Sequence, residues 1–169
     1  MDKIKAIIRA RMGSSRLPGK DLKKICGKSL LEWQVYRLKR SKMISEIIIA
    51  TSRSKIDNKI VNLCKKEKIK YFRGSEKDVL DRVSKTIEKF NVDIVAEFTG
   101  DSPLPDIGIV DKYIREFLRK KNKYDFLSNA IKTTYPPGMD VVIYKGTALI
   151  ELNANLKISD PLREHCSYN

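Results

Sequence analysis

The chain has 169 residues, of which 41% are hydrophobic and 33% charged, and its formal net charge is +14. This length and balance predict one soluble globular domain over residues 1–169, and the absence of any apolar run near roughly 20 residues argues against a membrane-spanning helix. Residues 1–82 hold 23 Lys and Arg against 9 Asp and Glu, whereas residues 83–169 hold 12 of each, so we expect a polyanionic partner on one side.

Strand-like and helix-like segments alternate along the chain. The apolar, β-branched run 4–8 predicts a buried strand, and the capping box from Ser29 to Glu32 predicts a helix that ends near residue 40. The other predicted strands are residues 46–51, 69–72, 92–98, 124–128 and 139–144. The other predicted helices are residues 57–66, 76–90 and 106–121, with a mostly helical tail from residue 146. This alternation is typical of an α/β fold with a mostly parallel central sheet flanked by helices.

Two simpler features concern location and cysteine chemistry. The sequence passes from Met1-Asp2-Lys3 straight into the first predicted strand, so we expect no secretory signal and a cytoplasmic protein. The three cysteines are far apart and show neither metal-site nor disulfide spacing, so we expect free thiols.

The segment after the first predicted strand is the most informative one, and it reads RARMGSSRLPGK over residues 9–20. Small residues let a ligand approach the backbone and cations neutralise its charge, so this composition is typical of a phosphate-binding loop. The segment lacks the P-loop pattern, because Pro18 stands where the second glycine is needed, and it lacks the Gly-x-Gly-x-x-Gly pattern of dinucleotide folds. A basic surface loop without a ligand is the simpler alternative.

Asp101 follows the predicted strand 92–98, in the sequence Thr99-Gly100-Asp101. Ligands of parallel α/β sheets collect at the carboxyl ends of strands, so Asp101 and the basic loop are expected to share one crevice. A carboxylate there can hold Mg²⁺, which prefers few carboxylates together with water and substrate phosphates. A triphosphate bound by Arg and Lys beside an Asp that binds a metal is an arrangement typical of nucleotidyltransferase active sites. An Asp that only stabilises a turn is the alternative.

Residues 11–20 resemble the signature of cytidylyltransferases that activate sugar acids. Three further segments match the spore-coat polysaccharide cytidylyltransferase-like branch: FRGSEKDVLDR at 72–82, GDSPL at 100–104 and REH at 163–165. The resemblance covers nearly the whole chain. It implies a nucleotide-diphosphosugar-transferase-like (Rossmann-like) fold that binds CTP and an acidic sugar, forms a CMP-sugar and pyrophosphate for surface polysaccharide synthesis, and assembles as a homodimer.

The resemblance also assigns site residues, on positions that match the motifs. Arg16 and Lys20 would hold the phosphates, and Asp101 would bind Mg²⁺; these three are the predicted catalytic residues. Fixed cations and a metal stabilise the charge that builds on the transferring phosphoryl group. The remaining predicted nucleotide-binding residues are Ala10, Arg11, Met12, Gly13, Ser14, Arg73, Gly74 and Ser75, the last three lying near base and ribose.

The sequence departs from the family pattern at its C-terminal side. Relatives continue well beyond this length and carry a second metal-binding Asp in a late segment that is missing here. We expect Asp140 to act as a substrate or second-metal residue and His165 to contact the sugar or a partner subunit; an Asp that begins a strand and a surface histidine are the plainer readings. A shortened chain, a minimal natural variant and an inactive or partner-dependent remnant all fit.

Three other functions stay open. A nucleotidyltransferase with another nucleotide or acceptor, such as a polyol phosphate, would use the same fold. A non-catalytic nucleotide-binding remnant fits the missing segment. A basic nucleic-acid-binding protein fits the charge, but we find neither an aromatic-rich RNA-binding motif nor a helix-turn-helix pattern, so we expect no nucleic-acid partner and no membrane partner.

Overall fold

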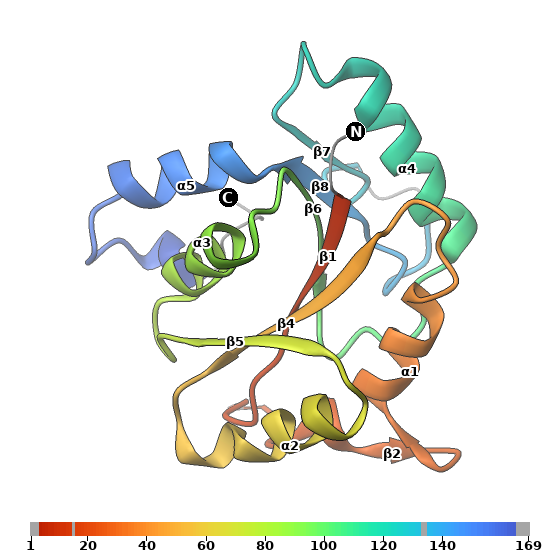
Figure 1. Ribbon diagram of the computed structural model, residues 1–169, viewed down its shortest axis with the longest axis vertical. Helices are drawn as coiled ribbons and strands as arrows, with labels where there is room; N and C mark the ends of the chain where they lie inside the picture. Colours follow the sequence, from red (N-terminus) through yellow and green to blue (C-terminus); the bar gives the residue numbers. More distant parts are fainter. Residues whose placement is uncertain (1–3, 15, 133–134, 165–169) are drawn as a thin grey trace.

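A twisted sheet with helices on both faces forms the body of the protein (Figure 1). The structure is a computed structural model that describes residues 4–14, 16–132 and 135–164. The main sheet has six strands in the order β5-β4-β1-β6-β8-β7. Their bounds are β1 (Ile4–Arg9), β4 (Glu46–Ser52), β5 (Lys70–Gly74), β6 (Ile94–Thr99), β7 (Phe126–Ser128) and β8 (Val142–Lys145).

The strand directions confirm the predicted mostly parallel α/β sheet. Strands β5, β4, β1 and β6 pair in parallel, whereas β8 runs antiparallel to β6 and β7 runs antiparallel to β8. The antiparallel pair therefore closes one side of an otherwise parallel sheet.

The helices bury both faces of the sheet. One face packs against α1 (Leu30–Leu38), α2 (Asn58–Lys66) and α4 (Ile107–Lys120), and the other packs against α3 (Val79–Phe90) and α5 (Gly146–Asn155). In β1, Ile7 contributes to the α3 side and Ile8 to the α1 side, because successive side chains of a strand point to opposite faces. Burial on both faces explains the continuous apolar run of β1. None of the described helices is long and apolar enough to span a bilayer.

Local side-chain caps set the ends of several elements. The predicted capping box is present: the Ser29 hydroxyl accepts a hydrogen bond from the Glu32 N–H at 3.2 Å, and Glu32 accepts the Ser29 N–H at 2.7 Å. Helix α3 begins three residues later than predicted, because Asp78 caps it by accepting the Asp81 N–H at 2.9 Å. Caps of this kind satisfy N–H groups that have no partner within the first helical turn.

Several parts of the prediction were wrong in detail, and β6 and β7 each begin two residues later than predicted. Strand β8 begins at Val142 instead of residue 139, because the Asn129 side chain binds both the Val141 N–H (2.8 Å) and the Met139 carbonyl (3.0 Å). A small hairpin of β2 (Lys24–Ile25) and β3 (Lys28–Ser29) was not predicted. Its turn places Cys26 and Gly27 at φ 49° and 82°, conformations that period-two patterns do not reveal.

The pairing of β1 with β6 positions the site. These strands are parallel neighbours and their last paired residues are Arg9 and Thr99. The loop after β1 and the Thr99–Asp101 turn after β6 therefore leave the sheet at the same edge. The Gly100 N–H donates a hydrogen bond to the Arg9 carbonyl at 2.8 Å, which continues the pairing beyond the strands.

Candidate active site

A cavity of about 410 Å³ opens at the edge where β1 and β6 end. Cationic and acidic side chains from distant parts of the chain meet in it. Its lining consists of Arg9, Ala10, Arg11, Ser14, Arg16, Lys20, Asp21, Val79, Arg82, Thr99, Gly100, Asp101 and Glu164. The predicted loop and Asp101 thus share one crevice, and all three predicted catalytic residues line it.

Two buried carboxylates hold the backbone of the loop. Asp21 Oδ2 accepts the Arg11 N–H at 3.0 Å, and Asp57 Oδ1 accepts the Met12 N–H at 2.7 Å. Asp57 follows β4 in the 3-10 helix η2 (Lys55–Asp57), so the segment after one neighbour of β1 helps to fix the loop. This arrangement holds the loop rigid without using its cationic side chains.

The loop presents side chains, more than backbone N–H groups, to the cavity. The N–H groups of Ala10 and Ser14 donate to backbone carbonyls at 3.2 and 3.0 Å, in addition to the two N–H groups that Asp21 and Asp57 hold. An anion in the cavity would therefore be bound chiefly by Arg11, Arg16 and Lys20. The predicted approach of a nucleotide to the backbone of residues 10–14 stays a prediction.

Lys20 and Asp101 form an ion pair inside the cavity. Burial raises the pKa of Asp101, but hydrogen bonds from Lys20 and Thr99 outweigh it and hold the pKa below its usual range. The buried Gln34 amide donates to the carbonyls of Thr99 and Ser102 at 2.9 and 2.8 Å, which fixes the turn that carries Asp101. Asp101 is therefore an ionised carboxylate in a fixed position.

Asp21 is the second carboxylate beside this pair, and sequence analysis did not assign it a role. It lies in the 3-10 helix η1 (Lys20–Leu22) and only 3% of it is exposed. Burial raises its pKa to about 6, against the opposing effect of the Arg11 N–H. A Cβ on Gly100 would lie 2.8 Å from Asp21 Oδ2, so the carboxylate approaches the β6 turn as closely as only glycine permits.

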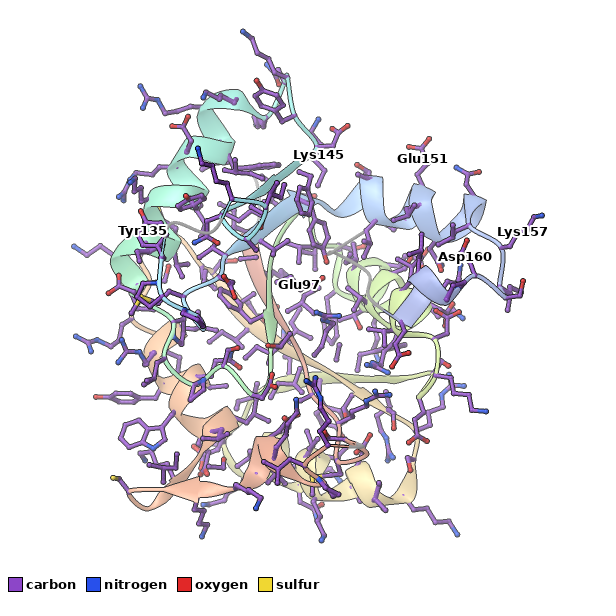
Figure 2. All side chains as sticks on the ribbon, turned by 180° about the vertical axis from the view of Figure 1, so that it is seen from behind. Glu97, Tyr135, Lys145, Glu151, Lys157 and Asp160 are labelled. Atoms are coloured by element: carbon purple, nitrogen blue, oxygen red, sulfur yellow. The ribbon has the colours of Figure 1, made fainter. Side chains whose placement is uncertain are left out.

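A buried network fixes Arg9 in the cavity wall. Arg9 Nε lies 3.1 Å from Glu97 Oε1, and the Tyr144 hydroxyl donates to Glu97 Oε2 at 2.6 Å. Figure 2 labels Glu97 in the interior, among the strands. The signal in the sequence was a lone Glu within the apolar run of β6, which needs a buried partner.

The predicted base-binding residues lie beside the cavity and are not part of its lining. The Arg73 guanidinium donates to the carbonyls of Ser52 and Ser54 and to Asn58 Oδ1, at 2.9, 2.8 and 2.8 Å. Arg73 therefore ties the end of β5 to the connection after β4. Met12, Gly13, Gly74 and Ser75 are likewise outside the lining.

Arg82 is a cavity residue that sequence analysis missed. It lies on α3 and is 2% exposed, and its Nη1 donates to the Ser75 carbonyl at 2.5 Å. A Cβ on Gly74 would lie 2.8 Å from Arg82 Cγ, so the arginine stem packs directly on the glycine. The available signal was its place in the segment FRGSEKDVLDR that matches the family branch, of which Arg82 is the last residue.

The C-terminal segment reaches the cavity through η3 (Pro161–Glu164). The buried Arg163 forms an ion pair with Asp78 at 2.8 Å, and Glu164 Oε1 lies 3.4 Å from Arg11 Nη2. Predicted His165 lies outside the described residues.

Asp140 lies near the same sheet edge but does not line the cavity. Val142 of β8 pairs with Glu97 of β6 in antiparallel register, and Asp140 lies two residues before Val142, in the loop that precedes β8. Its assignment as a substrate or second-metal residue stays a prediction.

The donor set fits Mg²⁺ bound partly by a substrate. The described residues contain no group of three or more His, Cys, Asp or Glu placed to enclose a metal. Mg²⁺ usually takes one or two carboxylates and completes its shell with water and phosphate. Asp101, ionised and in the cavity, meets that requirement.

A family model described as cytidylyltransferase matches residues 5–158. Among curated proteins, the uncharacterized protein MJ1063 of Methanocaldococcus jannaschii is 44% identical over 126 residues, covering 75% of this chain and 51% of that protein. The spore coat polysaccharide biosynthesis protein SpsF of Bacillus subtilis is 33% identical over 169 residues, covering 98% of this chain and 68% of SpsF. The chain thus spans between half and about two thirds of these relatives.

Two solved structures are similar to this chain. A cytidylyltransferase from Leptospira borgpetersenii superposes with a TM-score of 0.91 at 34% identity, covering 98% of this chain and 69% of that one. A CMP:2-keto-3-deoxy-manno-octonic acid synthetase complexed with CTP shares the fold, with a TM-score of 0.73 at 20% identity, covering 96% and 81%. The chain is a member of the cytidylyltransferase family.

Proposed function

We propose that the chain transfers a cytidylyl group from CTP to an acidic sugar and releases pyrophosphate, with Mg²⁺ as cofactor. The observation that supports this most directly is the convergence of Arg16 and Lys20 on Asp101 in one cavity. A triphosphate brings the charge that the cations need, and Asp101 offers the carboxylate that a phosphate-bound Mg²⁺ needs.

The reaction makes one bond and breaks one. The acceptor hydroxyl oxygen bonds to the α-phosphorus of CTP, the bond from that phosphorus to pyrophosphate breaks, and the hydroxyl proton passes to solvent. Arg16 and Lys20 bind the phosphates and compensate the charge that develops on the departing pyrophosphate. Mg²⁺ held by Asp101 would supply Lewis-acid polarisation of the phosphoryl oxygens.

Binding of a triphosphate would require the Lys20–Asp101 ion pair to open. Lys20 is 26% exposed and Asp101 37%, so the pair is open to exchange of partners. When triphosphate arrives, Lys20 can turn to a phosphate oxygen, because that oxygen offers the same kind of charge-assisted hydrogen bond. This exchange would release the Asp101 carboxylate for the cation.

The proposals that the nucleotide is CTP and that the acceptor is an acidic sugar are based on the relatives of this chain. By their names, SpsF acts in spore coat polysaccharide biosynthesis, and the synthetase with bound CTP acts on a keto-deoxy sugar acid. Arg73, Gly74 and Ser75 are the proposed base and ribose contacts, with Arg73 shaping the β5 end through the bonds described above. Asp140 and His165 are proposed acceptor contacts, and a homodimer is the proposed assembly.

A pyrophosphate-release assay tests the proposal. The protein is incubated with Mg²⁺, one of CTP, UTP, ATP or GTP, and a panel of sugar acids, and the CMP-sugar is identified by mass. We expect release only with CTP and a sugar acid, and none from Asp101→Asn. Equal release with another nucleotide would indicate a different nucleotidyltransferase. Absence of release with every pair, together with CTP binding, would indicate a nucleotide-binding protein without catalysis.

A further inference from the structure

We propose that Asp21 is a second carboxylate ligand of the divalent cation at Asp101. This inference rests on the proposed function for the presence of that cation. Asp21 lines the same cavity as Asp101, and only 3% of the residue is exposed. Asp21 lies directly after the family motif of residues 11–20, which therefore did not identify it as a site residue.

The two carboxylate oxygens of Asp21 differ in their hydrogen bonding. Oδ2 accepts the Arg11 N–H at 3.0 Å, whereas the buried Oδ1 has no hydrogen-bond partner among the described residues. Buried carboxylate oxygens without donors are unfavourable, and an ion or a water molecule can satisfy them. A cation would give Oδ1 the partner that the protein does not supply.

The companion carboxylate Asp57 shows that holding the loop does not require such an oxygen. Asp57 Oδ1 accepts the Met12 N–H at 2.7 Å, and its Oδ2 accepts both the N–H and the hydroxyl of Ser52. Both carboxylates are buried, and each binds the N–H of one of two consecutive loop residues. Of the two, Asp21 is the one that lines the cavity and has an oxygen without a hydrogen-bond partner among the described residues. Loop support therefore accounts for Asp57 completely and for Asp21 in part.

Asp21 also lies close to the residue that the proposed function gives to the cation. Its Oδ2 approaches Gly100, directly before Asp101, to 2.8 Å from where a Cβ would stand. Lys20, the neighbour of Asp21 in sequence, is the ion-pair partner of Asp101. Asp21, Lys20 and Asp101 therefore line one cavity, and a divalent cation bound there would balance the negative charges of both carboxylates.

Manganese binding to the full chain without nucleotide tests the proposal. Asp21→Asn keeps an oxygen for the Arg11 N–H and removes the negative charge, so the loop support remains. We expect this variant to bind Mn²⁺ about tenfold or more weakly by titration with electron paramagnetic resonance detection of free Mn²⁺. Glu116→Gln removes one carboxylate charge from α4, which contributes no residue to the cavity lining, and should bind Mn²⁺ within about twofold of the unchanged chain.

A second variant gives a readout that a purely structural role would not produce. Asp21→Cys should increase the preference for Cd²⁺ over Mn²⁺ and add a thiolate-to-cadmium absorption band, because thiolates favour soft metals. The unchanged chain with its own cysteines supplies the baseline. Unaltered Mn²⁺ affinity in a folded Asp21→Asn chain, an unchanged chain that binds no Mn²⁺, or no new cadmium band would each overturn the proposal. Because the Mn²⁺ titration contains no CTP, its result can be interpreted independently of the outcome of the pyrophosphate assay.

Discussion

The ammonium group of Lys20 forms an ion pair with the carboxylate of Asp101, which follows it by 81 residues in the chain. The pair joins the loop after β1 to the turn after β6, and the hydrogen bond helps keep Asp101 ionised. Both side chains are partly exposed, so the pair contributes little to stability, since exposed ion pairs are worth about 1 kcal/mol or less. Under the proposed function, the pair holds the ammonium group that would bind a phosphate beside the carboxylate that would bind the metal.

Lys20→Met should therefore separate catalysis from stability. We expect kcat/KM for CTP to fall about 100-fold or more, the usual loss when one donor to the developing charge is removed. The melting temperature should change little, because the pair is partly exposed. Lys24→Met on the exposed strand β2 is the matched control, and it should keep both values. A large loss of melting temperature in Lys20→Met would show that the pair is mainly structural.

Gly100→Ala should damage both the site and the fold. The new Cβ would lie 2.8 Å from Asp21 Oδ2 and 3.1 Å from the Arg9 carbonyl, so the two sides of the cavity must move apart. Overpacking of this kind costs about 1–3 kcal/mol in the free energy of unfolding, measured by urea denaturation. At Gly13 a Cβ would meet chiefly the end of the Glu76 side chain, at 3.2 Å, so Gly13→Ala should cost much less. Equal costs would argue against the close approach.

Arg163→Met should detach the C-terminal segment. Arg163 is buried and donates to Asp78, to the Leu156 carbonyl and to Asn153, so its loss leaves several partly buried acceptors without partners. We expect the free energy of unfolding to fall by about 1–3 kcal/mol in urea denaturation, as when hydrogen-bond acceptors lose their donor.

Two comparisons sharpen that measurement. The exposed Arg119, which faces Glu116 on α4, provides the control, and Arg119→Met should change stability by less than about 0.5 kcal/mol. A double-mutant cycle with Asp78→Asn measures the coupling directly. Additive effects of the two substitutions would show that the Arg163–Asp78 contact does not stabilise the segment.

Asp21 predicts a specific dependence of stability on pH. Its pKa is raised from 3.8 to about 6 in the folded state, chiefly by burial. The protonated carboxyl therefore contributes stability that is fully present below about pH 4 and is lost as pH rises through 6. Relative to Asp21→Asn, the unchanged chain should lose up to about 3 kcal/mol in the free energy of unfolding between pH 4 and pH 8. Urea denaturation of both chains across this range tests it, and parallel curves would contradict the raised pKa.

Much of the fold could be predicted from local patterns. The β-branched run of β1, the Ser29–Glu32 capping box and the apolar spacing of α3 each specify an element through interactions among near neighbours. The short hairpin at Cys26 and the late start of β8 were missed, because they depend on positive φ angles and on Asn129, which bonds across more than ten residues.

The sequence by itself determined that a cationic loop of small residues follows one strand and that a carboxylate follows another, because these are facts of order along the chain. Only the tertiary structure decided which side chains meet: parallel pairing of β1 with β6 brings Lys20 to Asp101, and burial gives Asp21 and Arg82 their places in the cavity. It also placed Arg73 on the backbone after β4. Burial and contact across the sheet depend on strand order, and strand order is a property of the folded chain.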